Sequence, residues 1–232
     1  KLAQALEQNA GRGLDRLVPY LDLVAIAIGA DVVSVAGENR ILAFHGVEQI
    51  KQNPRPGIKA LLGNKPVRDA HLSDFNFSIA PKINAAGRIK HGEYAVALLT
   101  TTEYEKAGEL AQEIEAFNRE RRSTEQQVTE EALKLAEAEA DCASTVVRAP
   151  HWHKGVIGIV ASRLQATYYR PTLVFTQSGT QWAASARSVK GYDVHSAIEA
   201  CQQHLLQFGG HAYAAGITLS DAQYEPFKAA FE

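Results

Sequence analysis

Several short stretches of the sequence carry side chains that could do chemistry, and each also has a purely structural explanation. Asp31 interrupts the apolar run "LDLVAIAIGADVVSV". Because an unpaired buried carboxylate is costly, Asp31 should either cap a turn or bind a cation. Asp22, in the same run, has no better claim to a role.

Two stretches combine small residues with cationic side chains. In "PKINAAGRIKHGEY", Asn84 and Arg88 could hold a phosphate oxygen or a carboxylate, or Gly87 could simply cap a helix end and leave Arg88 in solvent. In "APHWHKGVIGIVASRL", His153 precedes a glycine and a predicted helix, whose free N–H groups favour an anion. The alternatives there are metal ligation by His151 and His153, or an ordinary surface loop.

Two later stretches could contact a phosphate. In "AASARSVKGYD", strand alternation puts Ser185 and Arg187 on one face, which suits a phosphate pressed against a sheet; an edge-strand arginine in solvent is the alternative. In "FGGHAYAAG", Gly209 and Gly210 expose backbone N–H groups at a predicted turn. His211 could then donate to a phosphate or orient a leaving group, or be an ordinary packed histidine.

A single long helix is the clearest element that must position these residues. Residues 103–139 contain no proline, and Thr102 and Glu105 form a capping-box pattern at their start. Two apolar stripes are separated by residues 119–127, which include no apolar side chain. This pattern predicts a helix that connects two bodies across solvent, with a coiled-coil hairpin as the alternative. The stripes are Ala107, Leu110, Ala111, Ile114 and Phe117, then Val128, Ala132, Leu135 and Ala136.

The segments on either side of this helix differ in pattern. Before it, turn signals separate helical patterns and predict a largely helical lobe. After it, strands alternate with helices, which predicts a small α/β domain with a covered sheet. The helices predicted in the first lobe are 13–29, 39–52, 57–62 and 93–99. In the second lobe the predicted strands are 144–149, 171–177, 181–189 and 214–219, and the predicted helices are 155–169, 193–205 and 221–232.

The amino-acid composition limits the classes of protein to which the chain could belong. A hydrophobic content of 46% allows a real core, and the net charge of -2 hides two mildly basic regions around an acidic middle. Cys142 and Cys201 lack ligand spacing, which predicts a reduced, intracellular location, and no signal peptide or membrane span is expected. The sequence begins at Lys1 and contains no methionine, so we expect a piece of a longer protein.

Seven ordered motifs resemble the RecJ single-stranded-DNA exonucleases of the DHH phosphoesterase superfamily. The resemblance runs over nearly the whole chain and includes the spacing around the long helix. The motifs are "LDLVAIAIGADVV", "ENRILAFHG", "RPGIKALL", "APKINAAGR", "HKGVIGIVASRL", "SARSV" and "FGGHAYAAG".

The resemblance implies an α/β protein in three parts. Residues 1–101 would be the mostly helical end of a DHH domain, residues 102–141 a connecting helix, and residues 142–232 a DHH-associated domain with a mixed sheet. The implied activity is 5′-to-3′ hydrolysis of single-stranded DNA with Mn²⁺ or Mg²⁺, in DNA repair and recombination in the cytoplasm. A single-stranded-DNA-binding protein and a helicase are the implied protein partners.

The resemblance also implies roles for individual residues. Asp31 matches the family's last metal-binding aspartate and would be a metal ligand and catalytic. His211 would be catalytic and, with the glycines before it, form the GGH signature of the second domain. The residues implied to bind substrate are Asn84, Arg88, His153, Ser185, Arg187, Gly209, Gly210 and His211.

The sequence departs from the family in one respect. It contains no DHH triplet, and no paired-carboxylate motif precedes Asp31. One carboxylate cannot hold two hard cations, since each requires several oxygen or imidazole ligands. We therefore expect the chain to be the C-terminal part of a catalytic core, with little or no nuclease activity by itself. The alternatives are an oligoribonuclease or nucleotide phosphatase of the same superfamily and a non-catalytic DNA-binding protein, although the long helix and "NAAGR" favour RecJ.

Overall fold

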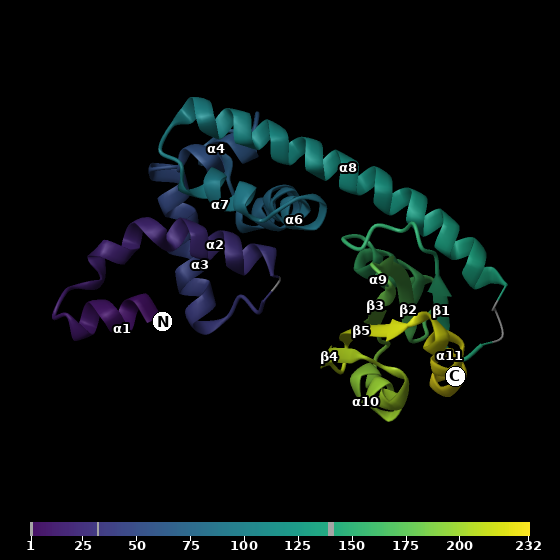
Figure 1. Cartoon of the computed structure of the whole chain (residues 1–232). Coiled ribbons are helices and arrows are strands. Elements are labelled where there is room, and N and C mark those ends of the chain that lie inside the picture. Colours follow the sequence, from purple (N-terminus) through teal and green to yellow (C-terminus); the bar gives the residue numbers. More distant parts are fainter. Residues whose placement is uncertain (1, 32, 139–141) are drawn as a thin grey trace. The chain divides into compact units, whose positions relative to one another are not determined.

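The computed structural model describes residues 2–31, 33–138 and 142–232 (Figure 1). The chain divides into two compact units, Lys1–Arg119 and Glu120–Glu232. The boundary lies inside the long helix α8 (Tyr104–Glu137), which therefore contributes its first half to one unit and its second half to the other. The helix predicted over residues 103–139 is confirmed up to Glu137, and residue 139 lies outside the described residues.

All the regular secondary structure in the described part of the first unit is helical. Its core combines α2, α3 and α4 with the segment 75–89, α7 and the first stripe of α8. The elements are α1 (Leu2–Asn9), a 3₁₀ helix (Leu14–Tyr20), α2 (Leu21–Ala30), α3 (Gly37–Gln52), α4 (Pro56–Leu62), a 3₁₀ turn (Val67–Asp69), α5 (Leu72–Asp74), a π-helical turn (Phe75–Ile79), α6 (Ala80–Ile89) and α7 (Glu93–Thr100).

Sequence patterns missed part of this helical packing. They did not predict α1, and of the helical run from Leu72 to Ile89 they predicted only a helix end near Gly87. Gly87 lies inside α6 and is not among the glycines with positive φ, so its predicted role as a left-handed cap is wrong. The tertiary packing of Phe75, Ile79 and Ala86 in the core accounts for a helix that the local turn signals obscure.

A buried ion pair fixes α2 in the first unit. Asp22 is fully buried, and its carboxylate accepts hydrogen bonds from the Leu23 N–H at 2.7 Å and from Arg55 Nε at 2.5 Å. The Arg55 guanidinium also donates to the Pro19 carbonyl oxygen and lies over the Tyr20 ring. Asp22 thus has a structural role that its local sequence did not reveal.

The second unit contains a five-stranded mixed sheet in the order β1-β2-β3-β5-β4. β1 and β2 are parallel, and the other neighbouring pairs are antiparallel. The strands are β1 (Thr145–Arg148), β2 (Thr172–Ser178), β3 (Gln181–Arg187), β4 (Gln207–His211) and β5 (Ala214–Ser220). The helices are α9 (Ile157–Tyr168), α10 (Val194–Ala200) and α11 (Tyr224–Phe231), with 3₁₀ turns at Gln202–His204 and Asp221–Gln223.

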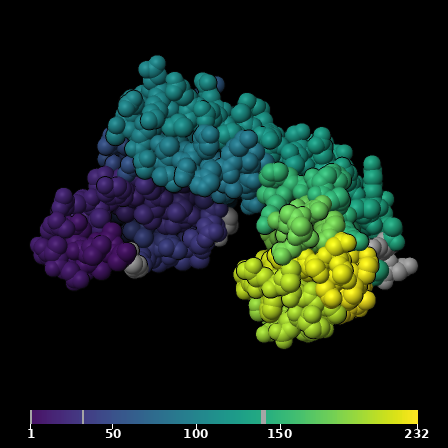
Figure 2. All heavy atoms as spheres, in the orientation of Figure 1, coloured from purple at the N-terminus to yellow at the C-terminus, as the bar shows by residue number. Residues whose placement is uncertain are grey.

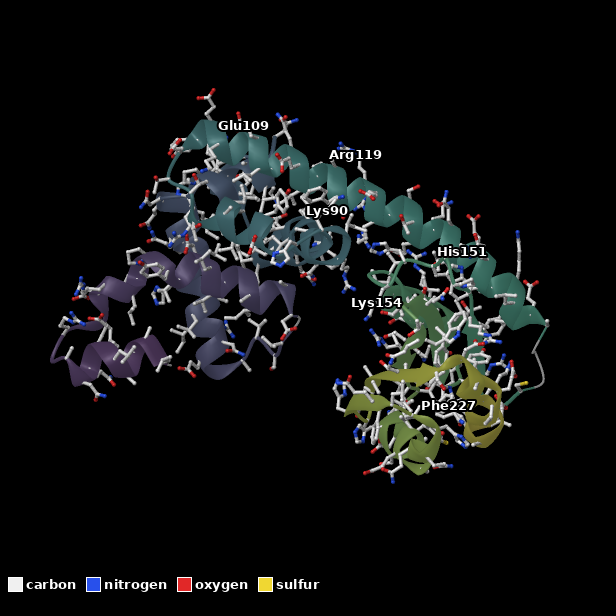
Figure 3. All side chains as sticks on the ribbon, in the orientation of Figure 1. Lys90, Glu109, Arg119, His151, Lys154 and Phe227 are labelled. Atoms are coloured by element: carbon white, nitrogen blue, oxygen red, sulfur yellow. The ribbon has the colours of Figure 1, made fainter. Side chains whose placement is uncertain are left out.

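The two faces of this sheet are covered differently. α10 and α11 cover one face, where Phe227 of α11 lies in the core (Figure 3). α9 and the second half of α8 cover the other face over β1 and β2, and α9 also packs against β3. The strands and helices of residues 142–232, green to yellow in Figure 2, form one continuous body. The predicted mixed α/β class is confirmed.

The second half of α8 differs in two ways from its predicted pattern. Leu135 is 44% exposed, so its place in the apolar stripe is wrong, and Leu133 packs against the core instead. Glu125, in the stretch without apolar residues, is only 4% exposed because Arg121 and Arg163 of α9 both pair with its carboxylate. The polar middle of the helix is therefore partly buried against α9.

The glycine pair lies in a strand rather than in the predicted turn. Gly209 and Gly210 belong to β4, and the connection to β5 is Ala212–Tyr213. The sequence "FGGH" has low strand propensity, but β5 supplies a hydrogen-bonded partner along its full length. Pairing with a neighbouring strand therefore outweighs the local turn signal.

Candidate nucleic-acid interface

Four of the predicted site residues share one face of the sheet. The strand register aligns Arg187 with Ala214, and Ala214 with His211. The next row on the same face aligns Ser185 with Gly216, and Gly216 with Gly209. Because directly opposed residues of neighbouring strands point to the same side, Ser185, Arg187, Gly209 and His211 lie on a common face.

Arg187 is held in place by its neighbours on β3 and α9. Its Nε donates to Ser162 Oγ at 3.1 Å, and its Nη1 donates to Ser185 Oγ at 2.9 Å and to the Ala186 carbonyl at 2.7 Å. A Cβ at Gly158 would lie 3.0 Å from Arg187 Nη2 and 3.1 Å from Ser185 Oγ, so the glycine allows α9 to approach both side chains. The predicted pairing of Ser185 with Arg187 on one strand face is confirmed, on a central strand rather than an edge strand.

A pocket of about 340 Å³ lies over the adjoining part of the same face. Gly209 and Gly216 form its floor, and Lys154, from the loop before α9, also lines it. Gln207 and Thr218, which are paired in the register of β4 and β5, also line it. A floor without side chains lets a ligand approach the backbone closely, and a lysine at the rim favours an anionic ligand.

The two glycines of β4 have different requirements. Gly210 has φ +152°, and a Cβ there would lie 2.3 Å from the Ala214 carbonyl oxygen, so the fold requires glycine. Gly209 has no positive φ, and a Cβ there would meet no atom within 4 Å. Gly209 is therefore not required by the packing around it, and its missing side chain leaves the pocket floor open.

The two site histidines are oriented in the same way. His211 Nδ1 accepts a hydrogen bond from the Tyr213 N–H at 3.2 Å, and His153 Nδ1 accepts one from the Gly155 N–H at 3.1 Å. An accepting Nδ1 places the proton of the neutral ring on Nε2. Both exposed rings can therefore donate from Nε2 to an oxygen of a ligand, as a phosphate contact requires.

The loop that carries His153 and Lys154 is fastened to α8 (Figure 3). Glu131 of α8 accepts from the Trp152 indole at 2.8 Å and pairs with His151 Nε2 at 2.7 Å. These hydrogen bonds, the one from Trp152 first, hold the pKa of Glu131 below its ordinary value of 4.5. His151 thus anchors the loop through Glu131.

We expect acid to release this loop. A carboxyl whose pKa is lower in the folded state stabilises above pH 4.5, and that contribution is lost as the pH falls through the folded value. The Trp152 emission should therefore change with a midpoint below pH 4.5. Because Trp182 also donates to a carboxylate, that of Asp221, the measurement is the difference between the wild type and Glu131→Gln. Identical acid titrations of the two proteins would contradict the assignment.

In the first unit, Asp31 and Asn84 line a common pocket of about 500 Å³. Asp31 is exposed at the C-terminal end of α2, where the helix dipole disfavours a carboxylate. Arg88 follows Asn84 by one helical turn of α6 and is also exposed. The structure thus brings Asp31 and Asn84 together, with Arg88 on the adjoining turn.

The described residues do not form a divalent metal site by themselves. Across residues 2–31, 33–138 and 142–232, no group of three His, Cys, Asp or Glu side chains could hold a metal ion. Asp31 offers one carboxylate, whereas a hard cation takes about six oxygen ligands.

Two residues of this site were not singled out from the sequence. Gly158 and Ser162 are four positions apart and face β3, where they accommodate and hold Arg187. The small residues in "GVIGIVAS" are the sequence signal for such a close helix–sheet approach. Only the fold shows that this face of α9 packs against β3.

Similarity to known proteins identifies the domain class of the second unit. Residues 142–232 match the family model described as "DHHA1 domain". The chain is also 37% identical over 231 residues to the single-stranded-DNA-specific exonuclease RecJ of Escherichia coli and 38% identical over 224 residues to that of Bacillus subtilis. These matches cover 94% of this chain in each case, but 40% and 28% of the two relatives.

Solved structures agree. RecJ of Thermus thermophilus in complex with Mg²⁺ superimposes with a TM-score of 0.86 at 31% identity and covers 98% of this chain and 35% of that chain. Its complex with Mn²⁺ gives the same TM-score. The chain is thus a RecJ-family segment that includes a DHHA1 domain, and it spans less than half the length of these relatives. No helix in the described part of the chain has the length and hydropathy needed to cross a membrane.

Proposed function

We propose that the chain is the substrate-binding part of a RecJ-type exonuclease that degrades single-stranded DNA from its 5′ end. The observation that carries this proposal is the sheet face on which Arg187, Ser185 and His211 lie beside a glycine-floored pocket. A fixed guanidinium, a hydroxyl and an imidazole donor suit the oxygens of one phosphate group. The relatives named as single-stranded-DNA-specific exonucleases support this reading.

The resemblance assigns each site residue a place in this function. Ser185, Arg187, Gly209, Gly210 and His211 would bind the substrate phosphate and the adjoining backbone. His153 would donate to the same ligand, and Asn84 and Arg88 would also bind substrate. Under this proposal His211 would also donate to the reacting phosphate and would be catalytic. Residues 1–101, 102–141 and 142–232 remain our proposed division into the end of a DHH domain, a connecting helix and a DHHA1 domain.

We propose that Asp31 contributes one ligand to a Mn²⁺ or Mg²⁺ site. The other ligands would come from residues that correspond to the part of the longer relatives that this chain does not match. Such ions activate water and stabilise charge on the phosphate. Since the described residues cannot hold the ions, the chain by itself should release no mononucleotides from 5′-phosphorylated DNA with manganese. Action in DNA repair and recombination in the cytoplasm, with a single-stranded-DNA-binding protein and a helicase, rests on the family resemblance.

The proposal predicts that Arg187→Ala weakens binding of the chain to a 5′-phosphorylated single strand roughly 10- to 150-fold, because a charge-assisted hydrogen bond is worth about 1.5–3 kcal/mol. The measurement is fluorescence anisotropy with a labelled oligonucleotide at several salt concentrations. The salt dependence of binding should also become shallower, since one phosphate contact is lost.

Lys228→Ala is the matched control for Arg187→Ala. It removes one positive charge from α11, which covers the opposite face of the sheet, and should leave affinity nearly unchanged. Equal affinity of wild type and Arg187→Ala would refute the phosphate role. Equal losses in the two variants would show only a general charge effect and would also count against it.

A further inference from the structure

Tyr213 is a large aromatic residue that the packing of the second unit leaves exposed. It lies in the connection between β4 and β5, and 66% of its surface is accessible to solvent. Its one ring neighbour in the described part of the chain is His211, at 6.1 Å between centroids and 62° between planes. The ring therefore contributes little to the core, and its exposed face is free to contact a ligand.

Three hydrogen bonds hold the backbone that carries this ring. The Tyr213 carbonyl accepts from the Ser188 N–H at 3.1 Å, and the Ala212 carbonyl accepts from the Val194 N–H at 3.1 Å. The Tyr213 N–H itself donates to His211 Nδ1 at 3.2 Å. A ring on such a support needs little ordering when it binds, so less entropy is lost on contact.

The position of this turn relative to Arg187 and His211 suggests which ligand the Tyr213 ring could bind. The row Arg187, Ala214 and His211 ends at the turn, and Ser188, which follows Arg187 directly, bonds to Tyr213. The ring thus lies beside His211, and its backbone bonds to the residue that follows Arg187. In single-stranded nucleic acid, a base on the nucleotide beside a bound phosphate offers a flat apolar face within reach of such a ring.

We propose that Tyr213 stacks on a base of single-stranded DNA adjacent to the phosphate held by Arg187 and His211. This inference rests on the proposed function and adds a base contact to it. Stacking tolerates any base because every base has an aromatic face. It also favours single strands, since a base in a duplex already stacks on its neighbours.

The test measures affinity of the full chain for a 5′-phosphorylated oligonucleotide by fluorescence anisotropy. Tyr213→Ala should weaken binding roughly 5- to 150-fold, the range expected for about 1–3 kcal/mol of stacking, and Tyr213→Phe should bind like the wild type. A set of strands, each with one abasic position near the 5′ end, locates the base. One abasic position should weaken wild-type binding by a similar factor and have no further effect in Tyr213→Ala.

Tyr169→Ala is the matched control, because Tyr169 is 67% exposed in the same unit at the end of α9 and should not affect binding. Wild-type affinity in Tyr213→Ala, or an abasic penalty that persists in that variant, overturns the stacking inference while Arg187→Ala still reports on the phosphate site. If the wild-type chain binds no single strand at all, the proposed function and the stacking inference both fail.

Discussion

Gly210→Ala is expected to destabilise the second unit by about 3 kcal/mol or more, whereas Gly209→Ala leaves its stability nearly unchanged. A methyl group at position 210 would lie 2.3 Å from the Ala214 carbonyl oxygen and 2.5 Å from the Ala215 Cα, and both are backbone atoms that cannot rotate away. The φ of +152° adds strain for any residue with a Cβ. Strands β4 and β5 would have to separate locally.

Urea unfolding followed by tryptophan fluorescence measures this difference. Both tryptophans of the sequence, Trp152 and Trp182, lie in the second unit, so their emission reports on that unit. Gly209→Ala is the matched control because the same change is made one residue away, where a Cβ meets nothing. Equal midpoints for Gly210→Ala and the wild type would show that the strand pairing at Gly210 is wrong.

Arg55→Leu is expected to destabilise the first unit by about 3–5 kcal/mol, because it leaves a buried carboxylate without its partner. The Asp22 side chain is 1% exposed and cannot reach water, whereas Arg55 is 24% exposed. Removing Arg55 is therefore more damaging than removing Asp22. The double variant Arg55→Leu, Asp22→Asn removes the charge while keeping an acceptor for the Leu23 N–H, and should recover a large part of the loss.

Hydrogen exchange of the α2 amides measures this effect. Circular dichroism at 222 nm reports helix in both units, and tryptophan emission should not respond to Arg55→Leu, since both tryptophans belong to the second unit. A double variant that is less stable than Arg55→Leu would contradict the account, because the remaining cost could not then come from an uncompensated charge. Unchanged exchange of α2 in the single variant would show that the pair contributes nothing.

Elements with strong internal periodicity could be predicted from the sequence, and elements stabilised by distant partners could not. The long helix has two apolar stripes, and β2, β3 and β5 have apolar strand patterns, so each carries its own signal. β4 contains two adjacent glycines, and its strand conformation depends on pairing with β5. The pairing of Asp22 with Arg55, which is 33 positions away, has no local signal at all.

In the candidate site, too, local patterns could be predicted from the sequence and contacts between distant residues could not. Alternation along β3 was enough to place Ser185 and Arg187 on one face. Their alignment with Gly209 and His211 depends on the strand order β3-β5-β4. In this order β5, the last strand in the sequence, lies between β3 and β4 and pairs with both. Lys154 and Gly158 join the site only because α9 covers this face of β3, and residue types alone do not specify which face a helix covers.

β4 is one of the two edge strands of its sheet, and edge strands expose unpaired backbone groups to which another chain can add a strand. The sequence of β4 counters this hazard. Gly210 departs from regular extended geometry, and the glycine pair gives a second strand few side chains to pack against. The glycine that opens the pocket floor thereby also reduces the side-chain surface that a second strand could pack against at this edge.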